Sequence, residues 1–162
     1  MRNTQSLDEL MANFAQPGRV RWLGVREKKW QPMRVVESIE VSPETGVSGD
    51  HYSGRSGKRQ ITLVQAEHLV AVAGMQGVAN VSPEQVRRNV MVEGINLLAL
   101  KSAQFFVGDA VLEFTGLCHP CSRMETILGE GGYNAMRGHG GITARVIQAG
   151  TITINDAVKV VD

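Results

Sequence analysis

The expected fold is decided by Gln104-Phe105-Phe106-Val107-Gly108-Asp109-Ala110-Val111, a stretch echoed later by Thr151-Ile152-Thr153-Ile154-Asn155-Asp156-Ala157-Val158. Each stretch places a Gly-Asp or Asn-Asp turn signal between two runs rich in β-branched or aromatic residues, a pattern typical of a β-hairpin. A hairpin that recurs in this way favours a curled or closed sheet over a long array of repeats. The two stretches therefore predict a mostly β fold.

Working outward, further apolar or alternating runs predict strands at 19–26, 35–41, 60–64, 90–92 and 142–149. Short helices are expected over 5–14, over 65–73 with Gly74 as terminator, and after Ser82, where Pro83 and Gln85 complete a capping box. About eight short strands without regular βαβ alternation predict a β-barrel-like α+β domain. No linker divides residues 1–162, so we expect a single domain, with a helix within 1–18 and a barrel from about 19 to 162.

Composition excludes several classes of protein. The chain has 162 residues, 43% hydrophobic and 20% charged, which is ordinary globular usage and argues against disorder. Its net charge of +1 and 5% aromatic content give no support for nucleic-acid or membrane binding. We find no apolar run of the roughly 18 residues that would span a bilayer, and no signal-peptide pattern at the N-terminus. With two closely spaced cysteines, the chain is expected to be cytoplasmic, with reduced thiols.

The segment Cys118-His119-Pro120-Cys121-Ser122-Arg123 carries the strongest chemical signal. A structural zinc site would need two more soft ligands, and no other cysteine exists, although a long-range Cys2His2 site stays open. A thioredoxin motif opens a long helix, and no long helix is expected here. A third hypothesis is a single functional thiolate at Cys121, stabilised by Arg123 and His119. The alternative is that both cysteines are small buried hydrophobic residues.

Three further stretches could hold an anion. The loop Gly46–Arg59 combines exposed amides with Arg55, Lys58 and Arg59, although a solvated surface loop fits it equally well, and residues 42–58 are too polar and glycine-rich to enter the core. Arg87 and Asn89 could contact a heterocycle and its phosphate, while Asn89 also suits a left-handed helix exit. Arg137 and His139 lie in the glycine-rich segment 129–141, which could form a lid or an uninvolved loop.

Taken in order, these motifs resemble the MOSC family, named for the C-terminal domain of molybdenum cofactor sulfurases, in its small stand-alone form. The likeness is carried by GVSGDHYSG, KRQITLVQAE, RRNVMVEGIN, FFVGDAVLEFTGLCHPCSR and GHGGITARV, which cover most of the chain from Gly46 onward. The resemblance implies a strongly bent β-barrel and the binding of molybdopterin-type molybdenum cofactor. It matches Cys121 to the family's molybdenum-ligating cysteine, and Arg87 and Asn89 to its pterin-contacting R-x-N element.

The resemblance also sets functional expectations. The first is an oxidoreductase that reduces N-hydroxylated small molecules, with Cys121 holding molybdenum and electrons supplied by a separate reductase, since no flavin or iron–sulfur motif is present. Cofactor contacts are expected from Lys58, Arg59, Arg87, Asn89, Arg123, Arg137 and His139. The alternatives are a sulfur carrier that bears a persulfide on Cys121, and a cofactor-free interaction module. Pyridoxal phosphate is not expected, because the chain has no room for the desulfurase domain of the sulfurases.

Overall fold

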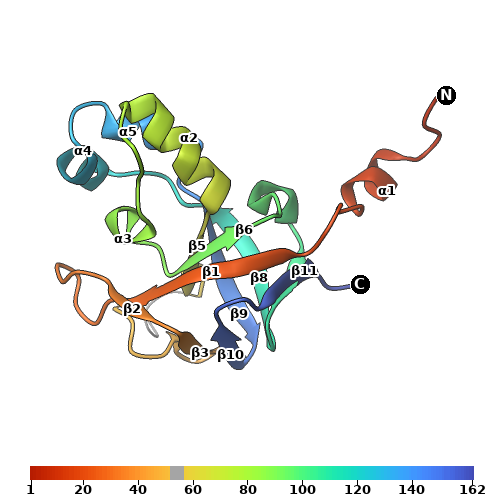
Figure 1. Ribbon diagram of the computed structural model, residues 1–162. Helices are drawn as coiled ribbons and strands as arrows, with labels where there is room; N and C mark the ends of the chain where they lie inside the picture. The colour runs from red at the N-terminus through yellow and green to blue at the C-terminus, as the bar shows by residue number, and fades with distance from the viewer. Residues whose placement is uncertain (52–56) are drawn as a thin grey trace.

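A closed β-barrel forms the body of the protein, as expected (Figure 1). The computed structural model describes residues 1–51 and 57–162. Within these ranges seven strands follow one another around the barrel in the order β1-β6-β5-β9-β8-β7-β11, and pairing of β11 with β1 closes it. All of these pairs are antiparallel except β5 with β6. The strands are β1 (Gly18–Val25), β5 (Ile61–Gln65), β6 (Val90–Glu93), β7 (Gln104–Val107), β8 (Ala110–Leu117), β9 (Ile142–Gln148) and β11 (Ala157–Val160).

The first of the two diagnostic stretches forms the predicted hairpin. Strands β7 and β8 pair with Val107 opposite Ala110, and Gly108 takes the positive φ of +57° that the tight turn requires. The second stretch does not form a hairpin, so that expectation was wrong. Asn155 turns the chain, at φ +76°, out of the strand β10 (Gly150–Thr153), which belongs to a different sheet from β11.

That other sheet contains three strands, β10, β3 (Ser38–Ser42) and β4 (Gly46–Val47), and lies beside the barrel (Figure 1). A short edge strand, β2 (Arg34–Val36), pairs antiparallel with the C-terminal end of β1. Val47 is fully buried among the barrel residues, which contradicts the expectation that residues 42–58 stay out of the core. Polar composition hid this strand, because two buried residues between turn formers give no periodic signal.

Short helices form a layer at one side of the barrel, with their own apolar cluster around Val64, Val72 and Met136 (Figure 1). They are α2 (Ala66–Gln76), α3 (Pro83–Val86), α4 (Ser122–Leu128) and α5 (Gly132–Met136), with a 3₁₀ turn, η1 (Leu97–Leu100), elsewhere. Helix α2 runs through Gly74 and ends at a left-handed Gly77, so Gly74 is not its terminator. The capping box of Ser82 and Gln85 is present as predicted.

The segment 116–141, which includes the cysteine motif and the glycine-rich segment 129–141, contains both α4 and α5. Its glycines serve close packing as well as turns: a Cβ on Gly140 would lie 2.0 Å from the carbonyl oxygen of Cys118. Glycine at this position lets two backbone segments approach, which the sequence cannot distinguish from flexibility.

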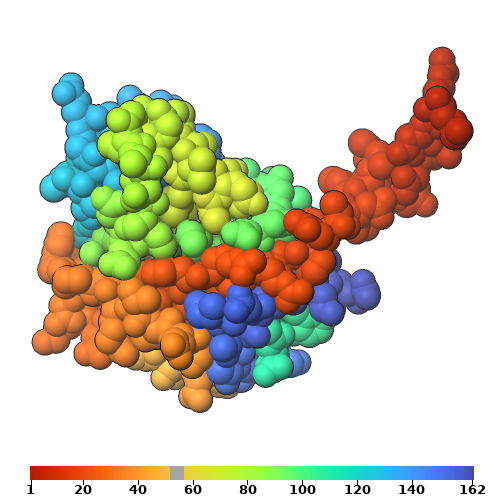
Figure 2. All heavy atoms as spheres, in the orientation of Figure 1, coloured from red at the N-terminus to blue at the C-terminus, as the bar shows by residue number. Residues whose placement is uncertain are grey.

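Helix α1 (Leu7–Met11) is capped by Ser6 and Glu9 and buries none of its residues. It projects from the body as an arm (Figure 2). Of the helices in the described part of the chain, none combines the length and apolarity that a membrane crossing demands.

Candidate functional site

Residues that flank several barrel strands form the candidate site. The registers Leu23↔Val90, Leu63↔Val90, Leu63↔Ile142 and Leu117↔Ile142 place β1, β6, β5, β9 and β8 side by side at this level. Beyond it on one side, β1 continues to Arg26, and β5 and β6 are preceded by Arg59 and Arg88. Strand β8 runs parallel to the direction of β5 and β6 and ends on the other side, and the segment that follows Leu117 carries Cys121 to the same cavity as these arginines. Residues separated by up to about a hundred positions are thereby collected into one place.

A cavity of about 320 Å³ lies at this convergence. Six basic side chains line it, together with Cys121, His119 and Met124, and the described lining contains no carboxylate; the basic residues are Arg26, Lys29, Arg59, Arg87, Arg88 and Arg123. Asp50 lies in a small adjoining pocket with Arg26, Arg59 and Arg87. Like charges gathered at a partly enclosed site repel one another, and an anion with several charged oxygens would offset that repulsion.

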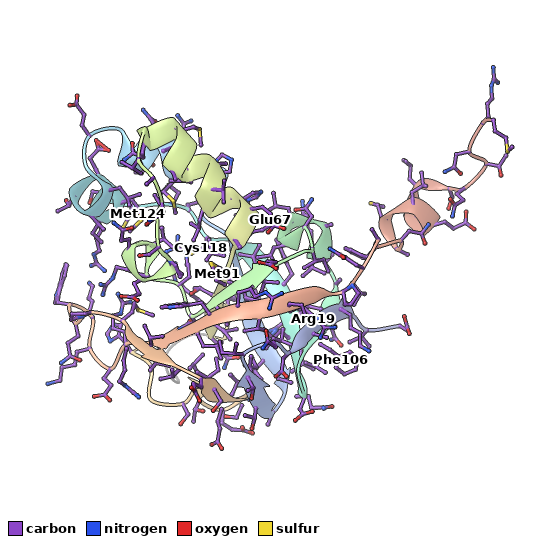
Figure 3. The ribbon with its side chains drawn as sticks, in the orientation of Figure 1. Arg19, Glu67, Met91, Phe106, Cys118 and Met124 are labelled. Carbon is purple, nitrogen blue, oxygen red and sulfur yellow. The ribbon has the colours of Figure 1, made fainter. Side chains whose placement is uncertain are left out.

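The two cysteines differ sharply in environment. Cys118 is buried, 2% exposed, and its amide donates to the carbonyl of Gly141 at 2.8 Å. Figure 3 shows it inside the molecule, between Met124 and Met91. Cys121 is exposed, precedes the first turn of α4, and lines the cationic cavity. Cys121 is therefore the thiol that a ligand can reach.

Arg87 attaches the loop that follows β1 to this site. It ends α3 in a left-handed conformation, φ +62°, and its guanidinium donates to the carbonyls of Lys29 at 3.2 Å and Gln31 at 2.8 Å. The same loop carries the exposed Trp30, whose ring centroid lies 4.3 Å from the guanidinium carbon of Arg123. The left-handed exit expected at Asn89 is thus found at Arg87.

Asn89 has a different neighbourhood. It is 7% exposed, and its amide oxygen accepts from the backbone and hydroxyl of Thr62, while its NH₂ donates to Gly24 and Asp50. These bonds join β1, β5 and the turn that carries Asp50. Asn89 lines the small adjoining pocket and not the larger cavity, so its predicted pterin contact stays a prediction.

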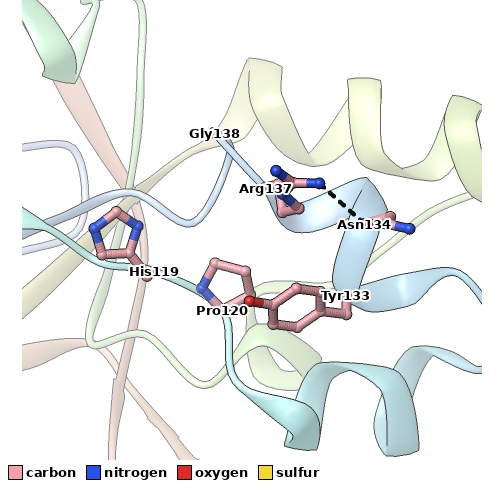
Figure 4. A pocket seen from close by; sticks show the side chains of 6 residues that line it. All are labelled: His119, Pro120, Tyr133, Asn134, Arg137 and Gly138. Atoms are coloured by element: carbon pink, nitrogen blue, oxygen red, sulfur yellow. Dashed lines mark hydrogen bonds between the residues drawn. The ribbon is translucent and has the colours of Figure 1, made fainter.

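Arg137 lies outside the cationic cavity. It borders a second hollow, of about 630 Å³, with His119, Pro120, Tyr133, Asn134 and Gly138 (Figure 4). His119 borders both cavities, so the two adjoin.

His139 borders neither cavity but lies against His68 of α2, with ring centroids 5.0 Å apart. Burial lowers the pKa of His68, and the charge that His139 can carry lowers it further. Residues 132–136 of the glycine-rich segment 129–141 form the helix α5, which buries Ala135 and Met136, so the segment is not an irregular loop throughout; its role as a lid stays a prediction.

The predicted loop Gly46–Arg59 is placed only in part. Arg59 lines the cationic cavity, whereas Lys58 contributes its backbone carbonyl as acceptor for Thr115 and is absent from the described lining. Arg55, with the rest of residues 52–56, lies outside the described residues. The phosphate-cradle hypothesis is thus supported for one of its three basic residues.

Sequence reasoning missed Arg26, Lys29 and Arg88, which complete the cationic lining. Arg88 is buried, 5% exposed, and donates to the carbonyl of Gly140 at 2.8 Å, so it braces the turn beside Cys118. Its position directly after Arg87 was a usable signal. Arg26 and Lys29 follow a strand whose partners the sequence does not reveal.

Comparison with solved structures supports the fold. The chain is similar to the YUAD protein from Bacillus subtilis (21% identity, TM-score 0.77, covering 88% of this chain and 94% of that one). It is also similar to YiiM from Geobacillus stearothermophilus (17% identity, TM-score 0.72, covering 90% and 76%) and to YiiM from Escherichia coli (18% identity, TM-score 0.65, covering 89% and 70%). No curated protein matches the chain.

The MOSC domain matches residues 3–159, nearly the whole chain. This match agrees with the observed barrel and with the resemblance that the order of the sequence motifs indicated. The protein therefore belongs to the MOSC domain family.

Proposed function

We propose that this protein binds molybdenum cofactor in the cationic cavity, with the Cys121 thiolate as the protein ligand to molybdenum. The observation that carries the proposal is the exposed thiol on a cavity that six basic side chains line. Molybdenum held by a dithiolene is soft enough to favour a thiolate. The pterin's phosphate calls for guanidinium groups, which hold such oxygens in paired hydrogen bonds. The residues present therefore fit both ends of the cofactor.

Each residue has a defined part in this arrangement. Arg59, Arg88 and Arg123 would bind the phosphate and the polar edge of the pterin. Arg87, already bonded to two carbonyls of the loop that follows β1, would hold that loop against the ligand. Asn89 would keep β1 and β5 in register beneath the cavity.

Bound there, the cofactor would supply two-electron reduction of N-hydroxylated small molecules, with electrons from a separate reductase. In the reaction an N–OH group gains two electrons and two protons, the N–O bond breaks, and the oxygen leaves as water. His119, which borders both cavities, is placed to donate a proton on the substrate side.

The test is the molybdenum and pterin content of protein made in a host that synthesises the cofactor. Wild type is expected to carry both, Cys121→Ala to lose molybdenum, and Arg88→Ala or Arg123→Ala to lose pterin. Cys118→Ala, which removes the buried thiol, is the matched control and is expected to keep the metal. Loss of metal from Cys118→Ala but not from Cys121→Ala would reverse the assignment, and a wild type without either component would refute it.

A sulfur carrier is the second candidate, because the same exposed thiol could bear a persulfide. Mass spectrometry separates the two functions. A sulfur adduct on Cys121 in protein that never carries molybdenum would favour the carrier.

A further inference from the structure

We infer that the hollow beside the cationic cavity is the substrate chamber, and that Arg137 binds a carboxylate on the substrate. The inference rests on the proposed function for the chemistry at Cys121. It adds a second anion site, which contains one arginine in place of six basic residues and binds the substrate, whereas the cationic cavity binds the cofactor. Its substrate class is N-hydroxylated compounds that also carry an acidic group.

The chamber has the size and position of a small-molecule site. Its volume of about 630 Å³ lies within the usual range of about 300–1,000 Å³ for such pockets. It adjoins the Cys121 cavity at His119, and Pro120, the residue before Cys121, forms part of its wall. A molecule bound here would contact His119 and Pro120, the two residues that precede Cys121.

The polar groups of the chamber select the kind of ligand. Arg137 is exposed, and within residues 1–51 and 57–162 its one side-chain hydrogen bond, to the amide oxygen of Asn134, is long at 3.4 Å. No carboxylate among the described residues lies within ion-pair distance of Arg137. One guanidinium with an amide and a phenol beside it suits a single carboxylate, whereas the six basic residues next door suit a phosphate.

The wall that carries these groups is fixed in place. Glu125 of α4 accepts hydrogen bonds from the amides of Gly131 and Tyr133, both at 3.0 Å, and so holds the start of α5. Gly132, Ala135 and Met136 bury the opposite face of α5. The Tyr133 side chain, near the start of α5, points toward Pro120, and the Arg137 side chain, at the C-cap, lies beside that of Asn134 (Figure 4). The chamber therefore lies between the segment that carries His119 and Pro120 and a helix, α5, that is held in place.

The test compares benzamidoxime with 4-carboxybenzamidoxime, which share the reducible group and differ by one carboxylate. With reduced methyl viologen as electron donor, wild type carrying cofactor is expected to prefer the carboxylated compound by about tenfold in kcat/KM, mostly through KM, as suits one charge-assisted hydrogen-bonded pair at a wet site. Arg137→Gln should bring the ratio of the two kcat/KM values close to one, while Arg137→Lys should keep part of the preference. Arg2→Gln, at an exposed position before α1, is the control for removing a positive charge and should keep the whole preference.

Two further measurements separate this inference from the proposed function. Molybdenum content should be the same in Arg137→Gln as in wild type; a loss would assign the chamber to the cofactor and overturn the inference. Binding of 4-carboxybenzamidoxime to cofactor-free protein, followed by NMR of labelled tyrosine, should weaken about tenfold in Arg137→Gln. If wild type lacks molybdenum but shows this Arg137-dependent binding, the proposed function fails and the chamber stands. Equal binding by both proteins would refute the chamber.

Discussion

At the scale of single residues, Cys121 differs from Cys118 in exposure and in the charges around it. A cavity of one sign concentrates anions from solution. Iodoacetate is an anion and iodoacetamide is neutral. We predict that the ratio of their alkylation rates, iodoacetate over iodoacetamide, is several-fold higher at Cys121 than at a free thiol in solution. At about 1 M salt, where the screening length falls to about 3 Å, the difference should vanish.

Peptide mapping by mass spectrometry reports both the rate and the site of labelling. Cys121→Ser should abolish the fast reaction, and Arg123→Ala should lower the iodoacetate advantage. Lys159→Ala, an exposed charge on β11, is the matched control and should leave it intact. Fast labelling of Cys118 would contradict the assignment of the reachable thiol.

Two glycines of α2 differ in backbone conformation, so alanine substitutions at them test how that conformation affects stability. Gly74 lies inside α2, and Gly77 caps it at φ +68°; a Cβ at either would meet no atom within 4 Å. Gly74→Ala is therefore expected to stabilise the protein by about 1 kcal/mol, the difference in helix propensity. Gly77→Ala is expected to destabilise it by about 1 kcal/mol, because alanine is strained in the left-handed region. Urea unfolding measures both, and equal effects would show that the end of α2 is misplaced.

At the scale of elements, Glu125 joins α4 to α5. Hydrogen bonds from the Tyr133 and Gly131 amides lower the pKa of its carboxyl below the ordinary value of 4.5. A lowered pKa in the folded state means that the stabilisation is complete above that ordinary value and is lost as pH falls through the folded value.

Glu125→Gln should therefore lower stability at neutral pH, and its deficit relative to wild type should shrink in acid. Urea unfolding from about pH 7 to pH 3 follows the change across the carboxyl's titration range. The exposed Glu130→Gln serves as control, with no pH-dependent difference expected. A deficit that stays constant with pH would show that the carboxylate does not hold α5.

At the scale of the whole molecule, the barrel and the N-terminal arm contribute unequally to stability. Helix α1 buries none of its residues, so deletion of residues 1–12 is expected to change the free energy of unfolding by less than about 0.5 kcal/mol. Deletion of residues 157–162 removes β11, which pairs with both β1 and β7 to close the barrel, and should abolish cooperative unfolding. Circular dichroism in urea tests both. A large loss from the first deletion would mean that the arm packs against the body or against another copy.

Local signals predicted much of the fold. The Gly-Asp hairpin, the apolar run before Gln65 and the Ser82 capping box each depend on neighbours in the sequence, and each is found in the structure. The second hairpin failed because its turn signal is real but its two strands find partners in different sheets. Turn residues determine where the chain bends, and pairing is decided by distant strands.

The sequence by itself determined the barrel class, the capped helices and the cysteine motif, because these depend on residue type and short-range spacing. Only the tertiary structure decided which thiol is exposed, brought Arg26 and Arg59 beside Cys121, and separated Arg137 into a second cavity. Strand pairing decided which of these segments lie side by side, since each barrel strand pairs with a partner that is distant in the sequence. Because the paired strands are far apart in the chain, their pairing cannot be predicted from the short-range spacing of residues.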